Sequence, residues 1–229
     1  MRVRQTVWTV FLALLMSIAL LAIAIYLPAT SNRLMLHLME RWAPAETSGL
    51  PAEDYPAMVE MITDYLRGGN EPFQYIYTVD GADYLAFHDY EQQHMEDVQD
   101  LFRLCRVVAW LGIGAALLWG FALRKKPRWF SPRTVLGMLL TELVAVTLIA
   151  AVGVLNFDGV FEFFHRIAFD NQLWMLNPRT DMLIRLMPSG FFATYAAIIG
   201  VLWLVELVAV LFISAWTARR EKNKEEYNA

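Results

Sequence analysis

The sequence predicts an α-helical membrane protein with four transmembrane helices, and two observations support this fold class. Of its 229 residues, 57% are hydrophobic and only 18% are charged, which is more apolar than an ordinary soluble domain. The chain also contains four long apolar segments without an internal repeat, each with the roughly 20 residues that a helix needs to cross a bilayer. These predicted spans cover about residues 7–27, 105–123, 135–155 and 191–216.

Basic residues beside these segments predict that both termini are cytoplasmic. Arg2 and Arg4 precede the first span, "RKKPRWFSPR" joins the second to the third, and "ARREKNKEE" follows the fourth. Short cytoplasmic segments retain Lys and Arg, so all three are expected inside. Two segments, about 28–104 and 156–190, are then extracytoplasmic parts of a single membrane-embedded domain over 1–229.

The first apolar segment also has features of a signal peptide. Arg2 and Arg4 form a basic n-region, and "AIA" offers small residues for cleavage. Its apolar run, however, is longer than the roughly 7 to 15 residues of a typical h-region. We therefore expect a retained anchor.

The predicted segment 28–104 contains signals for both helices and strands. Apolar residues at helical spacing predict one helix over "NRLMLHLMERW" and another that begins at Pro56 and ends before Gly68. The period changes to two in "QYIYTV" and "ADYLAF", on either side of Asp80 and Gly81, a pair favoured in tight hairpin turns. We expect a small α+β element between the first and second spans.

A further helix is predicted to lead into the second span. Asp89 can cap it, and Gln92 three residues later can complete a capping box. The helix is then expected to start near Tyr90 and to run continuously into the span. His94 and Asp97 share one of its faces.

Charge and cysteine content exclude several classes of protein. The segment 28–104 is rich in Asp and Glu while the predicted cytoplasmic segments are basic, and this division does not indicate a nucleic-acid partner. Cys105 is the single cysteine. An intrachain disulfide and a thiolate metal site are therefore excluded.

A second polar motif, "FEFFHRIAFDNQLWMLNPRTD", lies between the third and fourth spans. His165 is surrounded there by apolar residues, so its imidazole must find a hydrogen-bond partner or face a cleft. With His94, Asp97, Asp170 and Asp181 on the same predicted side of the membrane, it offers the groups needed for proton transfer. The same histidines and aspartates could instead bind a metal ion, although no known ligand spacing supports that.

The motifs "HMEDV" and "FHRIAFDNQLWMLNPRTDMLIRLMPSGFF" resemble the signature pair of the bacterial lipoprotein intramolecular transacylase family. The likeness is motif-specific over about residues 90–102 and 163–192. It implies a multi-pass enzyme of the bacterial plasma membrane, with its active site at the extracytoplasmic face and an interfacial helix between spans three and four. The implied partners are membrane lipid and lipoproteins whose N-terminal cysteine carries a diacylglyceryl group and a free α-amine.

The activity that this resemblance implies moves the sn-2 acyl chain from the glycerol oxygen to the cysteine amine. The product is a lyso-form lipoprotein, and neither a cofactor nor a metal takes part. We expect His94 and His165 to be the catalytic residues, as an acid and base pair. Alternatively, one of them attacks the ester and carries the chain as an acyl-imidazole.

Five further residues are expected to support the reaction or to bind substrate. Asp97 or Asp181 would orient an imidazole, and Asn171 or Arg185 would stabilise the oxyanion. Trp174 would hold an acyl chain.

An alternative from another class is a non-enzymatic accessory or sensor protein with an external metal site made of histidines and aspartates. A transporter is disfavoured, because Glu142 and Glu206 are the only acidic residues inside the predicted spans and provide little of a polar pathway. We expect each of these carboxyl groups to pair with a neighbouring helix or to be protonated.

Overall fold

A computed structural model describes residues 2–70, 72–125 and 132–227 of the chain. It contains the four long apolar helices that the sequence predicts. Their segments long and apolar enough to cross a membrane are Val7–Ala29, Asp89–Ala122, Thr134–Leu155 and Ser189–Ile213. The second continues 16 residues further toward the N-terminus than the predicted span, because one unbroken helix joins the polar motif around His94 to the apolar segment.

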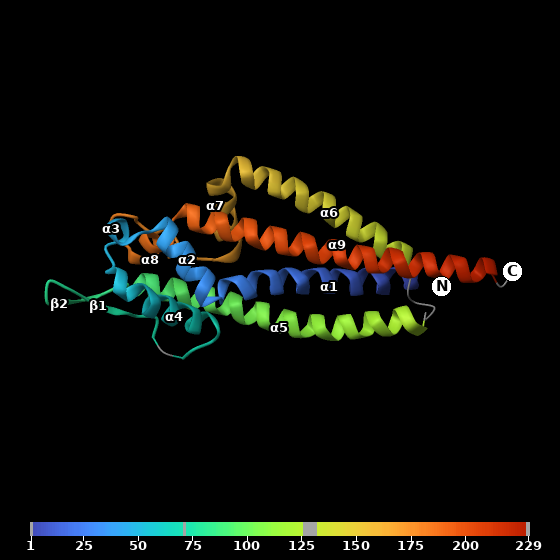
Figure 1. The fold of residues 1–229 in the computed structure, drawn as a ribbon, viewed down its shortest axis with the longest axis horizontal. Coiled ribbons are helices and arrows are strands. Elements are labelled where there is room, and N and C mark those ends of the chain that lie inside the picture. Colours follow the sequence, from blue (N-terminus) through green and yellow to red (C-terminus); the bar gives the residue numbers. More distant parts are fainter. Residues whose placement is uncertain (1, 71, 126–131, 228–229) are drawn as a thin grey trace. The chain divides into compact units, whose positions relative to one another are not determined.

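These segments belong to four helices, shown in Figure 1: α1 (Arg2–Ala29), α5 (Asp89–Lys125), α6 (Pro132–Leu155) and α9 (Ser189–Tyr227). Many of their outward side chains are large and apolar, including Leu117, which is 72% exposed. Exposing such side chains to water is costly, whereas hydrocarbon accommodates them. This is a multi-pass membrane protein.

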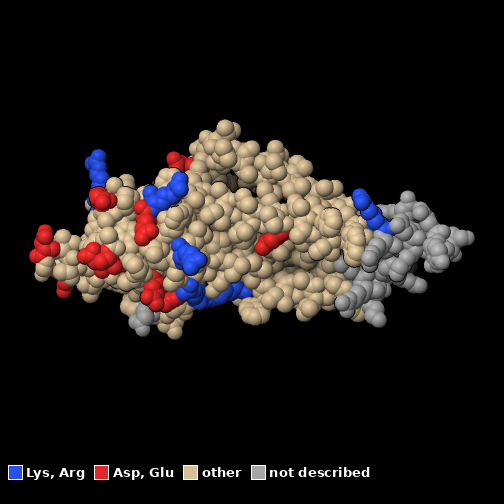
Figure 2. All heavy atoms as spheres, in the orientation of Figure 1, with Lys and Arg blue, Asp and Glu red and all other residues tan. Residues whose placement is uncertain are grey.

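The described residues group into two compact units. One unit takes the chain up to Ala24, Arg106–Ala151 and the chain from Ile199 onward; the other takes Ile25–Cys105 and Val152–Ile198. We call them the membrane unit and the polar unit. In the view of Figure 2, charged side chains gather over the polar unit, and few are seen on the part of the membrane unit that is drawn in colour.

In the membrane unit, small residues allow helices to approach closely. A Cβ atom added to Gly112 of α5 would lie 2.2 Å from the Cβ of Ala19 on α1. Lipid is as apolar as the helix surfaces, so no hydrophobic driving force brings helices together in a membrane. They associate instead by close packing, which small residues allow. The buried side chains of this unit include Leu12, Trp119 and Leu207.

The two acidic residues of the membrane unit differ in their partners. Glu142 of α6 forms a side-chain hydrogen bond with Ser17 of α1, so its predicted pairing with a neighbouring helix is confirmed. The other oxygen of Glu142, Oε2, is buried without a hydrogen-bond partner among the described residues, and the same holds for Oε2 of Glu206.

The polar unit holds short helices and one hairpin around its own apolar core. Its elements are α2 (Asn32–Trp42), α3 (Ala45–Ser48), η1 (Ala52–Asp54), α4 (Tyr55–Leu66), β1 (Ile76–Val79), β2 (Ala82–Leu85), α7 (Phe157–Ala168) and α8 (Met182–Leu186). Met39, Met58, Phe73 and Leu186 are among the fully buried residues of the core. Both helices predicted in segment 28–104 are thus confirmed, as α2 and α4.

The predicted hairpin is also confirmed. β1 and β2 pair antiparallel with Val79 opposite Ala82, and Asp80 and Gly81 form the turn with positive φ angles of 52° and 79°. Such a turn matches the right-handed twist of the strands. An isolated two-stranded hairpin is only marginally stable, and here Gln74 holds its base by bonding both the N–H and the carbonyl of Phe87.

The start of α5 differs by one residue from the predicted capping box. The helix begins at Asp89, and the side chain of Glu91, not that of Gln92, accepts the backbone N–H of His88 at 2.8 Å. Gln92 instead donates to the carbonyl of Phe87. The pairing of Asp89 with Gln92 is therefore wrong, and the register of the cap is set one residue earlier.

Candidate active site

The two histidines that the sequence singles out meet in the polar unit. His94 lies in the second turn of α5 and His165 in the last turn of α7, 71 positions apart in the sequence. Their ring centroids are 6.0 Å apart with an interplanar angle of 36°. Both are buried, with 6% and 7% of their surfaces exposed. The fold therefore brings the two imidazoles close together.

The orientation and tautomer of His165 follow from a bond to its own helix. Its Nδ1 lies 2.7 Å from the carbonyl oxygen of Phe161. A carbonyl can only accept, so Nδ1 carries the proton and Nε2 of the neutral ring holds a lone pair. Burial lowers the pKa of His165 below its ordinary 6.5, although the Phe161 carbonyl opposes this. The ring is thus a neutral base near pH 7.

Aromatic side chains enclose the His165 ring. Phe161 is nearest, with a centroid distance of 4.2 Å, followed by Trp174 at 5.1 Å, Phe164 at 5.3 Å and Phe169 at 5.5 Å. Such an enclosure excludes water and removes the hydration that would favour the charged ring. The same rings offer an apolar surface to a hydrocarbon chain.

The His94 ring has an unused hydrogen-bonding atom. Its Nδ1 is buried and has no hydrogen-bond partner among the described residues. Phe169 packs edge-on against this ring at 5.1 Å, so Phe169 touches both histidines. A buried polar atom without a partner is costly and is common where a substrate supplies the missing bond.

Asp97 and Asn171 are brought together next to this pair. The Asn171 side-chain amide donates to Asp97 Oδ2 at 2.8 Å, and its own Oδ1 accepts the backbone N–H of Leu173. Trp174 Nε1 donates to the carbonyl of Asn171 at 3.0 Å. These bonds fix the loop after α7 in the orientation that brings the Trp174 ring against His165.

Asp181 has partners that differ from the predicted ones. It accepts hydrogen bonds from Tyr90, Thr180 and the N–H of Asn177, and among the described residues no hydrogen bond joins it to the ring of either His94 or His165. These donors lower its pKa despite burial. Asp181 therefore joins the turn that precedes α8 to Tyr90 of α5, and its predicted role of orienting one of these imidazoles has no geometric support.

Arg185 of α8 also contacts other residues than the prediction requires. Its Nη2 approaches the sulfur of Met182 at 3.6 Å, and its Nη1 would lie 3.3 Å from a Cβ added to Gly49. Its buried Nε has no hydrogen-bond partner among the described residues. The guanidinium thus packs against the end of α3, and the described contacts do not join it to the oxyanion position predicted for it.

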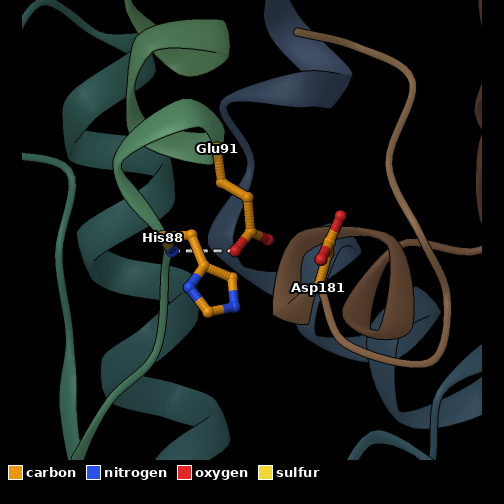
Figure 3. A group of neighbouring side chains, drawn as sticks. All are labelled: His88, Glu91 and Asp181. Atoms are coloured by element: carbon orange, nitrogen blue, oxygen red, sulfur yellow. Dashed lines mark hydrogen bonds between the residues drawn. The ribbon is translucent and has the colours of Figure 1, made fainter.

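Three side chains near the start of α5 form a separate group. Ligand atoms of His88, Glu91 and Asp181 lie within 4.8 Å of one another, and Figure 3 shows the two carboxylates facing each other with His88 beside them. Of the described residues, this is the one group of three or more such side chains that converge in this way, and it does not include His94 or His165. The predicted metal site made of those two histidines thus gains no support.

Glu91 is an important residue that the sequence did not single out. Glu91 has no exposed surface and bonds the N–H of His88 through one oxygen and the N–H of Leu183 through the other. Its position three residues before His94, on the inward face, was a usable signal. For Phe169, only the fold shows that its ring contacts both histidines.

Comparison with known proteins identifies the family. A sequence model described as "Lipoprotein intramolecular transacylase Lit" matches residues 10–192. The chain belongs to the lipoprotein intramolecular transacylase family. As a member of this family it is an enzyme, a membrane-integral acyltransferase. A search of curated proteins gives no match.

Solved structures of lipoprotein intramolecular transacylase Lit from Bacillus cereus share the fold. One has a TM-score of 0.75 at 18% identity and covers 97% of this chain and 99% of its own. Two structures of variants with one histidine replaced, by arginine or alanine, each have a TM-score of 0.71. Their identities are 17% and 18%; they cover 96% and 95% of this chain, and 94% and 95% of their own.

Proposed function

We propose that this enzyme moves the sn-2 acyl chain of a diacylglyceryl-modified lipoprotein to the α-amine of its N-terminal cysteine. The product keeps one acyl chain on glycerol and gains an N-acyl group. The observation that carries the proposal is the pair of buried imidazoles with centroids 6.0 Å apart. Membership of the family supports the substrate class.

The bond changes balance without a co-reactant. The amine nitrogen attacks the ester carbonyl and loses a proton, and the tetrahedral intermediate expels the glycerol oxygen, which takes up a proton. One C–N bond forms and one C–O bond breaks. A base and an acid are both needed, and one proton passes from amine to alcohol overall.

We assign the base to His165 and the acid to His94. The Phe161 carbonyl leaves Nε2 of His165 with a lone pair, and the lowered pKa keeps this ring neutral near pH 7. Once protonated, His165 carries a charge with its ring centroid 6.0 Å from that of His94, so its proton can be passed on to the departing oxygen through the His94 ring. The unpartnered Nδ1 of His94 is free to bond the ester or the alcohol.

Holding the reactants together is the larger part of the task. Amine and ester belong to one molecule, and a well-oriented intramolecular reaction can gain roughly 7 to 11 kcal/mol over a bimolecular one. The aromatic rings of Phe164, Phe169 and Trp174 provide the apolar surface against which the acyl chain would lie. We place this reaction at the extracytoplasmic face of the bacterial plasma membrane.

The alternative in which a histidine attacks the ester is a distinct chemical proposal. Nε2 of His165 holds the lone pair that such an attack needs. A substrate whose cysteine amine is blocked by acetylation separates the two routes. Direct transfer leaves this substrate and the protein unchanged, whereas the covalent route transfers one acyl mass to His165.

Mass spectrometry of an N-terminal lipopeptide tests the function itself. We would compare an abundant lipoprotein from bacterial cells that lack N-acyltransferase activity, with and without this chain. We expect an unchanged peptide mass but fragmentation that places one acyl group on the cysteine amine. The shift should vanish with His94→Ala and with His165→Ala. A lipopeptide that keeps both chains on glycerol while the wild-type protein is folded in the membrane would refute the proposal.

A further inference from the structure

The segment from the end of α7 into the first turn of α8 is attached to α5 on both sides of His94. We call residues 169–183 the connecting segment. Near its start, Asn171 bonds Asp97. Near its end, Asp181 accepts from Tyr90, and the N–H of Leu183 donates to Glu91.

The three attachment residues on α5 share a face with His94. Tyr90 and Glu91 precede His94 by four and three positions, and Asp97 follows it by three. Residues at these spacings are neighbours on a helix surface. The connecting segment therefore crosses α5 directly over the turn that carries His94.

Phe169 is the part of the connecting segment that touches both imidazoles. Its backbone N–H closes the end of α7 by donating to the carbonyl of His165 at 3.0 Å, and its ring lies 5.1 Å from His94. Asn171 follows two residues later. The Asp97–Asn171 bond thus lies closest in sequence to Phe169 among the three attachments.

We propose that Asp97 is a positioning residue, whose bond to Asn171 holds the connecting segment so that Phe169 and Trp174 present the two imidazoles to substrate. This inference rests on the proposed acyl transfer. It differs from the expected role of Asp97 as the group that orients an imidazole, because Asp97 Oδ2 is bonded to the connecting segment. Asp97 then affects the rate of acyl transfer through the position of its hydrogen bond to Asn171, and its negative charge is not required.

An exchange of the two side chains distinguishes geometry from charge. In the double variant Asp97→Asn with Asn171→Asp, the amide donates from α5 and the carboxylate accepts on the connecting segment. The carboxylate that the exchange introduces on the connecting segment retains an oxygen for the N–H of Leu173, which Asn171 Oδ1 accepts now. The single variant Asn171→Asp instead sets two carboxylates against each other.

We would measure the rate of acyl transfer for the wild type, the single variants Asp97→Asn and Asn171→Asp, and the double variant. The measurement is made in detergent on a purified diacylglyceryl lipopeptide. Asn171→Asp is expected to lower kcat about tenfold with little change in KM, and the exchange to restore kcat to within about threefold of wild type. Asp100→Asn, one turn further along α5 at a residue paired with Arg103, is the matched control and should stay within about twofold.

Each outcome decides between defined roles. If the exchanged variant is as slow as the slower single variant although its unfolding midpoint equals that of wild type, the carboxylate of Asp97 itself is required and the positioning role is wrong. If kcat per folded molecule is the same in all variants and only the unfolding midpoint of the single variants falls, the bond is merely structural and the proposal also fails. An inactive wild-type protein would instead refute the proposed function.

Discussion

Nδ1 of His165 lies 2.7 Å from the carbonyl oxygen of Phe161, one helical turn earlier on α7. This bond leaves Nε2 as the free basic atom of a neutral ring. It also ties the orientation of the ring to the backbone of α7, so that no carboxylate is needed to select the tautomer.

The first prediction separates the structural and the chemical roles of His165. In His165→Asn the amide can still donate to the Phe161 carbonyl, but no atom replaces the basic Nε2. We expect unfolding near the wild-type midpoint and a rate of acyl transfer at least about 100-fold lower. His165→Ala, which loses both functions, should be less stable than His165→Asn. Substantial activity in His165→Asn would contradict the assignment of the base.

The second prediction concerns the dependence on pH. Burial lowers the pKa of His165, so this base becomes protonated only below the ordinary value of 6.5. The rate should therefore hold down to pH 6.5 and fall as the pH drops through the lowered pKa. The folded state should also lose stability below pH 6.5, because the unfolded chain binds the proton more readily there.

Histidine-selective ¹⁵N NMR measures that pKa directly. The chain has only four histidines, and the His165→Asn spectrum assigns the signal. Trp174→Ala removes a ring 5.1 Å from His165 and admits water, so the pKa should rise toward 6.5. A wild-type His165 that titrates at or above 6.5 would show that the aromatic enclosure does not control its protonation.

The third prediction is that Glu91 stabilises the polar unit by closing two helix starts. Gln has one acceptor oxygen where the Glu91 carboxylate uses two, so Glu91→Gln leaves either the N–H of His88 or that of Leu183 without a partner. We expect a loss of about 1 to 3 kcal/mol in the free energy of unfolding. Glu96→Gln, on the exposed side of the same helix, is the control. Equal stability of the two variants in detergent unfolding would exclude this double cap.

The fourth prediction tests the contact between α1 and α5 in the membrane unit. A methyl group at Gly112 would lie 2.2 Å from the Cβ of Ala19, whereas one at Gly114 meets no atom within 4 Å. We expect Gly112→Ala to lower the free energy of unfolding by about 1 to 3 kcal/mol. Gly114→Ala should leave it unchanged or raise it, since Ala favours helix. The reverse order of the two thermal midpoints would contradict this packing.

Features that depend on local sequence were predicted successfully. The four apolar segments, the helices α2 and α4, and the hairpin turn at Asp80 and Gly81 each follow from periodicity or backbone preference within a few residues. The error in the capping box of α5 is also local. Glu91 lies three residues after His88 and Gln92 three residues after Asp89, so both pairs have the spacing of a capping box, and the structure uses the first.

The site itself was predicted only in part. His94 and His165 were selected as residue types and are adjacent in the fold. Asp181 was assigned to an imidazole because it is acidic and lies in the right motif, yet Tyr90 and Thr180 occupy its oxygens. Spacing along the chain does not reveal which of several donors reaches a carboxylate across 91 residues.

The sequence by itself determined that the chain crosses a membrane, where its helices lie, and which two histidines stand out. The hydrophobicity and the helical period of a segment depend only on residues that are close in the sequence, so both can be read without knowing the fold. Only the tertiary structure decided that Phe169 contacts both imidazoles, that Glu91 caps two helices, and that Asp97 bonds Asn171. These contacts join residues far apart in the chain, so they depend on how the packed elements bring donors, acceptors and rings within a few ångströms.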